Sequence, residues 1–349
     1  MLKWISVWMV FFTAGVVCAL FGLPQLHEET ILASKEYTGD IETLLQWQDI
    51  DFQKPEAVVG DDETGKTSLM IELPQGIVAE DVTIENDYMA QRVLVHIPSD
   101  SKDYFSDYKI KGSSNHIEGI DYYHENGDGV IALGLDTVCE VQKSYADEML
   151  CLNFAEPHEI YDKVVVVDAG HGGRDSGASK LGINEKDINL AILLEVQRIF
   201  DESDENIGVY CTRTEDSNPS LEQRAALANE VGADLFISIH SNSTRGGFMS
   251  NTNGTVVMYS ESDDSELSSM RLAEICLDEV TGTLDSKRVG LLKGDKIYII
   301  RSSEVPVALV EVGFMTNREE LANLNDPEYQ KQAAQGIYNA IVRAFEEGY

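Results

Sequence analysis

The sequence predicts an α/β domain over residues 163–349, with a mostly parallel sheet flanked by helices. A small all-β, sandwich-like domain over residues 66–156 and an N-terminal membrane helix precede it. Three observations lead to this prediction. After residue 163, short apolar runs alternate with segments of helical periodicity, which is typical of layered α/β domains. Between residues 66 and 156, alternating apolar runs are separated by turn residues, as in all-β domains. Near the N-terminus, twenty consecutive residues carry no charge.

Residues 4–23 form this uncharged run, which is long enough to cross a bilayer core as a helix. Lys3 precedes the run and acidic residues follow it, so the positive-inside tendency places the rest of the chain outside the cytoplasm, in the cell envelope. An uncleaved anchor in the cytoplasmic membrane competes with a signal peptide that is cleaved after Ala19. Residues 1–24 are therefore expected to be a signal or anchor segment, and the protein to be membrane-anchored or secreted.

Acidic residues dominate the composition: 61 acidic and 26 basic residues give a formal net charge of −35. Such a surface repels phosphate backbones, which excludes nucleic acid as a partner. Residues 25–65 are polar and acidic and are expected to be a stalk or linker. The five cysteines form no CxxC pair, which excludes a zinc ribbon and a thioredoxin-type motif.

Seven strands are expected in the all-β domain, with turn residues between them. They cover residues 68–73, 82–84, 92–97, 117–122, 130–135, 138–143 and 149–154. The last two are expected to form a hairpin centred on residue 145. This register places Cys139 opposite Cys151, within reach of a disulfide. The alternative is that both cysteines are small apolar residues of the core.

In the α/β domain, the run 164–167 is continuously apolar, as expected for a strand that is covered on both faces. Further strands are expected at residues 207–211, 235–239, 256–259, 297–300 and 307–310. Helices are expected at residues 188–200, 221–231, 267–280 and 329–345.

Four ionisable side chains are expected to meet at one edge of the predicted sheet. His171, His240 and Glu311 each lie at or just past the carboxyl end of an apolar strand. In an open α/β sheet, the ligand crevice lies at that end. Glu185 opens the first helix after a glycine-rich loop, and is therefore able to reach the same crevice.

Two imidazoles and one carboxylate are a typical set of catalytic zinc ligands, which leaves a fourth position for water. Bound zinc lowers the pKa of that water to about 7. A carboxylate that is not on the metal accepts the proton of the water. We expect Glu311 to be this base, because the flanking Val310 and Val312 remove water from it and raise its pKa.

Each of these residues also has a structural interpretation. A single histidine is more often a hydrogen-bonded structural residue than a ligand, and Glu185 is at a position where a helix dipole favours any carboxylate. The other histidines have no comparable setting: His27, His96, His116, His124 and His158.

Four groups of segments follow one another over residues 163–349. They read VVVVDAGHGGRDSGA, then GINEKDINLAI, then CTRTED with LEQRAALANEVGADLFISIHSNS, then VPVALVEVGFMTNREE. This series resembles the zinc-dependent N-acetylmuramoyl-L-alanine amidases, a family of bacterial cell-wall hydrolases. The resemblance implies that His171, Glu185 and His240 bind Zn²⁺ and that Glu311 is the catalytic base. It also implies a peptidoglycan substrate, cleaved at the amide between the lactyl group of N-acetylmuramic acid and L-alanine of the stem peptide.

Residues 66–156 more weakly resemble the AMIN-type β domain that precedes such catalytic domains, which implies a role in targeting the cell wall. Two other functions stay open. One is another zinc amidohydrolase or peptidase that acts on stem peptides. The other is a non-catalytic wall-binding protein, although the presence of all four chemical positions argues against it.

Overall fold

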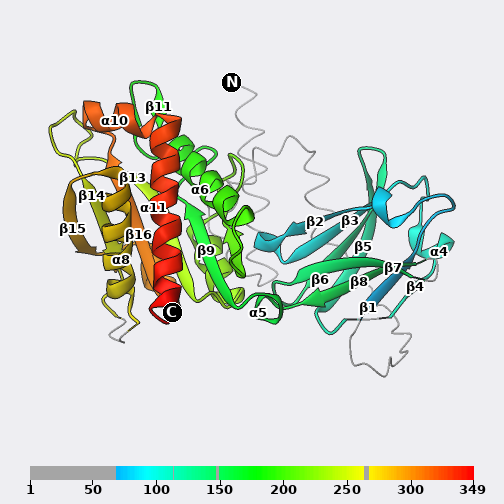
Figure 1. Ribbon diagram of the computed structural model, residues 1–349. Coiled ribbons are helices and arrows are strands. Elements are labelled where there is room, and N and C mark those ends of the chain that lie inside the picture. Colours follow the sequence, from blue (N-terminus) through cyan, green and yellow to red (C-terminus); the bar gives the residue numbers. More distant parts are fainter. Residues whose placement is uncertain (1–67, 113, 147–148, 263–266) are drawn as a thin grey trace, which may run out of the picture. The chain divides into compact units, whose positions relative to one another are not determined.

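The computed structural model describes residues 68–349 except residues 113, 147–148 and 263–266, all of them within one compact unit. The expected membrane helix at residues 4–23 and the expected stalk at residues 25–65 lie outside the described residues. In the described part of the chain, no helix combines the length and the apolar composition that crossing a membrane requires. The described residues form an all-β part and an α/β part (Figure 1).

The all-β part consists of two four-stranded antiparallel sheets (Figure 1). One has the order β4-β1-β8-β7, with strands Ile110–Lys111, Ser68–Glu72, Met149–Ala155 and Glu140–Ala146. The other has the order β2-β3-β6-β5, with strands Thr83–Asp87, Arg92–Ile97, Asp128–Leu135 and Ile117–Glu125. Ile71 and Leu150 of the first sheet share one buried core with Val95 and Ile131 of the second. The two sheets therefore form a sandwich that contains all seven expected strands.

Short helical turns connect these strands, and the sequence analysis did not expect them because they are too short to show a helical period. They are η1 (Ala79–Asp81), η2 (Tyr88–Ala90), α4 (Tyr104–Asp107) and, before the α/β part, α5 (Pro157–Ile160).

Of the two alternatives for Cys139 and Cys151, the disulfide is wrong: both thiols are free, and Cys139 is buried in the core of the sandwich. Ala146 of β7 pairs with Met149 of β8, so Cys151 faces Ser144 and Cys139 lies before the start of β7. The hairpin is centred further along the chain than residue 145. Most of β7 is exposed, so its sequence lacks the apolar alternation that would have revealed where the strand ends.

The α/β part is built on a six-stranded sheet with the order β12-β9-β13-β16-β14-β15. In that order the strands are Ile207–Cys211, Lys163–Ala169, Leu235–Asn242, Val307–Phe314, Thr255–Tyr259 and Arg288–Lys293. Neighbouring strands are parallel except for β14 and β16, so the sheet is mixed but mostly parallel. The carboxyl ends of the three adjacent strands β9, β13 and β16 therefore meet at one edge.

Helices cover both faces of this sheet. α6 (Glu185–Asp201), α8 (Ser269–Leu284) and α11 (Pro327–Glu346) pack on one face, as Figure 1 shows. α7 (Leu221–Glu230) and α9 (Tyr298–Ser302) pack on the other. Val165 and Val167 of β9 belong to the first core, and Val164 and Val166 belong to the second. This alternation explains the continuous apolar run, because every side chain from Val164 to Val167 is buried. The short hairpin β10 (Ser179–Lys180) and β11 (Ile183–Asn184) precedes α6, and α10 (Arg318–Leu324) follows β16.

The strand expected at residues 297–300 is wrong, because this segment begins helix α9. Ile299 and Ile300 are buried against the core that includes Leu227 of α7. A short apolar run that is fully buried has no period that distinguishes a strand from a helical turn. The sixth strand is instead β15, at Arg288–Lys293, whose charged ends and exposed side chains hide the strand pattern.

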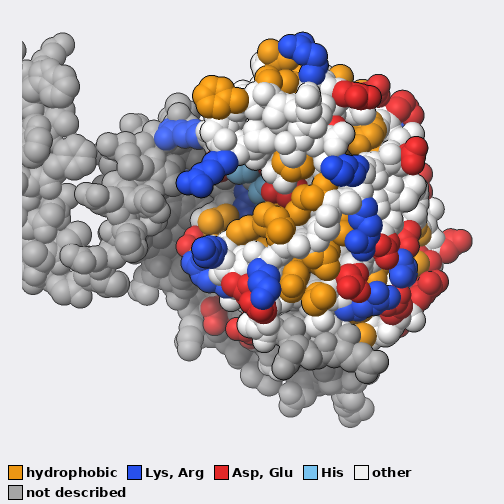
Figure 2. All heavy atoms as spheres, turned by 90° about the vertical axis from the view of Figure 1, so that its left-hand side faces the viewer, with side chains coloured by type: hydrophobic (Ala, Val, Ile, Leu, Met, Phe, Trp, Pro, Cys, Tyr) orange, Lys and Arg blue, Asp and Glu red, His pale blue; other side chains and the backbone are white. Residues whose placement is uncertain are grey.

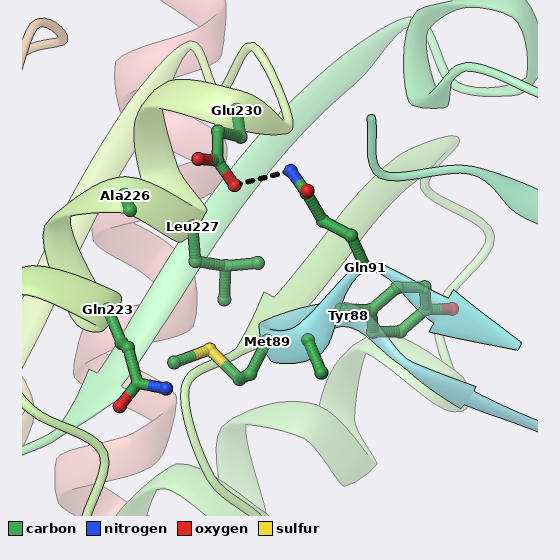
Figure 3. Close-up of a pocket in the computed structure, with 8 residues that line it drawn as sticks. Tyr88, Met89, Gln91, Gln223, Ala226, Leu227 and Glu230 are labelled. Atoms are coloured by element: carbon green, nitrogen blue, oxygen red, sulfur yellow. Dashed lines mark hydrogen bonds between the residues drawn. The ribbon is translucent and has the colours of Figure 1, made fainter. Parts of the chain in front are cut away.

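The turn η2 of the all-β part contacts helix α7. The Tyr88 ring meets the Tyr210 ring edge to face at a centroid distance of 5.0 Å. The carboxylate of Glu140 accepts hydrogen bonds from both hydroxyl groups, at 3.0 Å from Tyr88 and 2.6 Å from Tyr210. Gln91 donates a hydrogen bond of 2.7 Å to Glu230 across a pocket of about 240 Å³ between η2 and α7 (Figure 3). These contacts join the all-β part to β12, through Tyr210, and to α7, through Glu230.

Candidate metal centre

Three elements bring the expected metal ligands together. His171 lies just past β9, Glu185 is the first residue of α6, and His240 lies near the end of β13. One potential ligand atom from each lies within 4.8 Å of the others. Glu185 Oε1 lies 3.2 Å from His171 Nε2 and 3.1 Å from His240 Nδ1. The carboxylate therefore sits between the two imidazole rings.

Hydrogen bonds from the surrounding loop orient this set. Asp175 Oδ2 lies 2.8 Å from His171 Nδ1, which leaves Nε2 of that ring facing Glu185. The backbone N–H groups of Ala178 and Ser241 donate to the two carboxylate oxygens of Glu185, at 2.8 Å and 3.1 Å. A second carboxylate on the outer nitrogen of a ligand histidine is common at protein metal sites, because it holds the ring in one orientation.

Two glycines allow the chain to pass close to the three side chains. A Cβ atom at Gly170 would lie 2.2 Å from Cε1 of His240. One at Gly177 would lie 2.5 Å from Oε2 of Glu185 and 2.6 Å from Cδ2 of His171. Any larger residue at either position would displace a ligand. The donor set and this close approach of the backbone both fit a small cation.

Electrostatic interactions keep the site charged. Burial raises the pKa of Glu185, but its hydrogen bonds with His171 and His240 outweigh burial and hold the pKa well below its usual range. Burial lowers the pKa of His171, but Glu185 and Asp175 outweigh it and raise that pKa to about 9. Without a metal, the buried carboxylate is therefore ionised and paired with an imidazolium.

Glu311 lies beside this set on the next strand. The parallel register of β13 and β16 pairs His240 with Glu311. Burial raises the pKa of Glu311 to about 7, as expected from its apolar neighbours. Its Oε2 atom is buried, and no group in the described part of the chain forms a hydrogen bond with it. A carboxyl group with this pKa and a free oxygen is suited to accept and return a proton near neutral pH.

Figure 2 shows histidine atoms set back below the surrounding surface of the α/β part, with hydrophobic and basic side chains around them. Histidines outside the set have other partners: His116 Nδ1 lies 3.2 Å from Asp136, and His158 Nε2 lies 2.9 Å from the carbonyl of Gly232. The structure does not bring these two residues into the site.

Similarity to known proteins establishes the family of this chain. The model of the family described as N-acetylmuramoyl-L-alanine amidase matches residues 165–343, which is more than half of the chain. The chain belongs to this amidase family. The matched range begins after the all-β part, so the resemblance of residues 66–156 to an AMIN domain stays a prediction.

Several relatives match the amidase domain. The uncharacterized protein YqiI of Bacillus subtilis is 39% identical over 191 residues, which cover 55% of this chain and 88% of YqiI. The germination-specific N-acetylmuramoyl-L-alanine amidase of B. subtilis is 30% identical, with coverages of 53% and 81%. The amidase LytC is 32% identical, but the match spans 36% of LytC. The crystal structure of an N-acetylmuramoyl-L-alanine amidase from Clostridium difficile 630 has a TM-score of 0.50 and 28% identity, and the match covers 54% of this chain and 98% of that chain.

The amidase domain also contains a buried polar network that the sequence analysis missed. Asp168, Arg213 and Arg224 are almost completely shielded from solvent at the end of β9. Arg224 Nη1 lies 2.5 Å from Asp168 Oδ1, and Arg213 donates to the carbonyl groups of Ala169 and Gly170 at 2.8 Å and 3.2 Å. The sequence did contain a signal, because Arg224 is a charged residue on the buried face of an amphipathic helix.

We predict that Gly170→Ala weakens metal binding by at least about tenfold, because the new methyl group would force His240 out of its position. Atomic emission measures the metal that the variant retains after dialysis, and this metal content tests the prediction. The matched control is Gly282→Ala in α8, where a Cβ atom meets nothing within 4 Å. Wild-type metal content in Gly170→Ala would contradict the assignment of His240 as a ligand.

Proposed function

We propose that this protein is a zinc-dependent N-acetylmuramoyl-L-alanine amidase that cleaves peptidoglycan between the lactyl group of N-acetylmuramic acid and L-alanine of the stem peptide. The observation that carries the proposal is the convergence of His171, Glu185 and His240 within an amidase domain. His₂Glu sets of this kind are used by catalytic zinc sites, which keep one position open.

His171, Glu185 and His240 would hold the zinc ion. Bound there, zinc supplies a Lewis acid that polarises the scissile carbonyl and makes a water molecule more acidic. Glu311 accepts a proton from the attacking water at Oε2 and donates it to the nitrogen of L-alanine as the amide breaks. The pKa of about 7 allows Glu311 to take and release this proton near neutral pH.

The extracytoplasmic cell envelope is the proposed place of action, because peptidoglycan lies there and residues 4–23 have the length and flanking charges of an anchor or signal segment. For residues 66–156 we propose a wall-targeting role, which the weak AMIN-like pattern supports.

Product analysis tests the proposed reaction. Purified residues 53–349 are incubated with peptidoglycan, with and without a zinc chelator. We expect intact stem peptides that begin with a new L-alanine amino group. The chelator should stop the release of these peptides, and added zinc should restore it. Shortened stem peptides would show a peptidase instead. No product from the zinc-loaded protein would favour a non-catalytic wall-binding protein.

We predict that Glu311→Gln retains zinc near the wild-type level but lowers turnover by about 10²–10⁴, the usual contribution of a positioned acid–base group. The amide keeps the shape of the side chain and cannot accept the proton. The matched variant is Glu185→Gln, which should lose zinc, and added zinc should restore part of its activity. If Glu311→Gln loses the metal and Glu185→Gln keeps it, the two roles are exchanged.

We also predict that zinc binding at pH 7.5 releases close to one proton from His171. The metal-free imidazole is protonated below its pKa of about 9, whereas zinc binds the neutral ring. The apparent affinity should therefore rise by about tenfold per pH unit up to about pH 9 and then level off. Calorimetry in two buffers with different ionisation enthalpies measures the proton.

The control for this measurement is Asp175→Asn. Asp175 helps to raise the pKa of His171, so the variant should release fewer protons and its affinity should level off at lower pH. Zinc binding to the wild-type protein without proton release at pH 7.5 would contradict the assignment of His171 as a ligand.

A further inference from the structure

We propose that Arg224 is a positioning residue of the metal site: its guanidinium group holds the backbone of His171 in the conformation that directs the imidazole toward Glu185 and His240. This inference rests on the proposed metal-binding function of the three side chains. The hydrogen bonds of Arg224 reach the main chain of His171 and no side chain of the three ligands, so it acts through the main chain.

The backbone at His171 needs an external restraint. His171, Gly172 and Gly173 all have positive φ angles, of 63°, 136° and 52°. Glycine adopts such angles readily, but a residue with a Cβ atom in the left-handed region is disfavoured. His171 therefore keeps this conformation only if neighbouring groups stabilise it.

Arg224 supplies that restraint through several hydrogen bonds. Its Nη2 donates to the carbonyl oxygen of His171 at 2.7 Å, and its Nη1 donates to the carbonyl oxygen of Ala169 at 2.8 Å. Nη1 also lies 2.5 Å from Asp168 Oδ1, and Nε donates to the carbonyl oxygen of Pro219 at 3.0 Å. One planar group thus connects the end of β9 to the first ligand.

The guanidinium group is itself held in one orientation. Asp168 Oδ1 accepts a second hydrogen bond from the hydroxyl of Thr212 at 2.6 Å, and Oδ2 accepts one from Ser238 at 2.5 Å. Asp168 and Arg224 are only 1% and 2% exposed, so water does not compete with these bonds. The carboxylate of Asp168 therefore fixes the orientation of the Arg224 guanidinium group, and that group in turn fixes the backbone of His171.

A lysine at position 224 would not replace this arrangement. It keeps a positive charge opposite Asp168, but a single ammonium group does not present the rigid fork that spans Asp168, Ala169 and His171. The substitution Arg224→Lys therefore separates the geometry of the fork from the charge of the ion pair.

The test measures the zinc affinity of the full chain without substrate, by competition with a chromophoric chelator. We expect Arg224→Lys to bind zinc about 10–100 times more weakly than the wild type, the usual loss when a group that orients a ligand is removed. The visible spectrum of the cobalt-loaded protein should change as well, because the geometry of the ligands changes. Wild-type zinc affinity in folded Arg224→Lys would overturn the proposal.

Ile341→Val is the control for general destabilisation. Ile341 lies on the buried face of α11, in the core, and is not part of the polar network. The variant should lower the melting temperature and leave zinc affinity unchanged. If Ile341→Val weakens zinc binding as much as Arg224→Lys does, the effect of Arg224 is only one of stability and the proposal is overturned.

A milder variant decides the question if Arg224→Lys does not fold. Thr212→Val removes only the hydroxyl that shares Asp168 Oδ1 with Arg224, and it preserves the shape of the side chain. Zinc affinity about threefold weaker or more supports the proposal, and unchanged affinity overturns it. Since these assays contain no substrate, a protein that binds zinc but hydrolyses no amide would contradict the proposed function alone.

Discussion

The buried ion pair between Asp168 and Arg224 is the interaction on which the site depends. Removing two charges from water is costly, and such a pair is tolerated only where further hydrogen bonds satisfy both groups. Here two hydroxyl groups donate hydrogen bonds to the carboxylate of Asp168, and three main-chain carbonyls accept hydrogen bonds from the guanidinium group of Arg224. Because two of those carbonyls, of Ala169 and His171, belong to the end of β9 and the loop after it, these hydrogen bonds also determine the path of the chain at His171.

Two glutamates at the same edge of the sheet have opposite electrostatic environments. Glu185 accepts backbone hydrogen bonds and lies between two imidazoles, which lower its pKa despite burial. Glu311 is buried with one oxygen unpartnered by any described residue, and its pKa rises to about 7. One carboxylate is thereby kept ionised, as metal binding requires, while the other is able to change its protonation state. Pairs of acids whose environments move their pKa values apart are typical of catalytic sites.

The sequence predicted the elements whose side chains are buried on one or both faces, because burial leaves a period in the sequence. It also placed His171, Glu185, His240 and Glu311 at one edge, since the carboxyl ends of neighbouring parallel strands must meet. It did not predict α9, because a short buried apolar run has no distinctive period, or the hairpin register at Cys151, because β7 is mostly exposed. The role of Arg224 depends on three-dimensional contacts with main-chain carbonyls, which no pattern of side chains reveals.

The central claim is that two imidazoles and one carboxylate, held by this network, bind a single zinc ion. X-ray absorption spectroscopy of the zinc-loaded protein tests it most directly. We predict one zinc per chain with two imidazole nitrogens at about 2.0–2.1 Å and a carboxylate oxygen at about 2.0–2.2 Å. A sulfur ligand at about 2.3 Å, or a spectrum with fewer than two imidazoles, would contradict it.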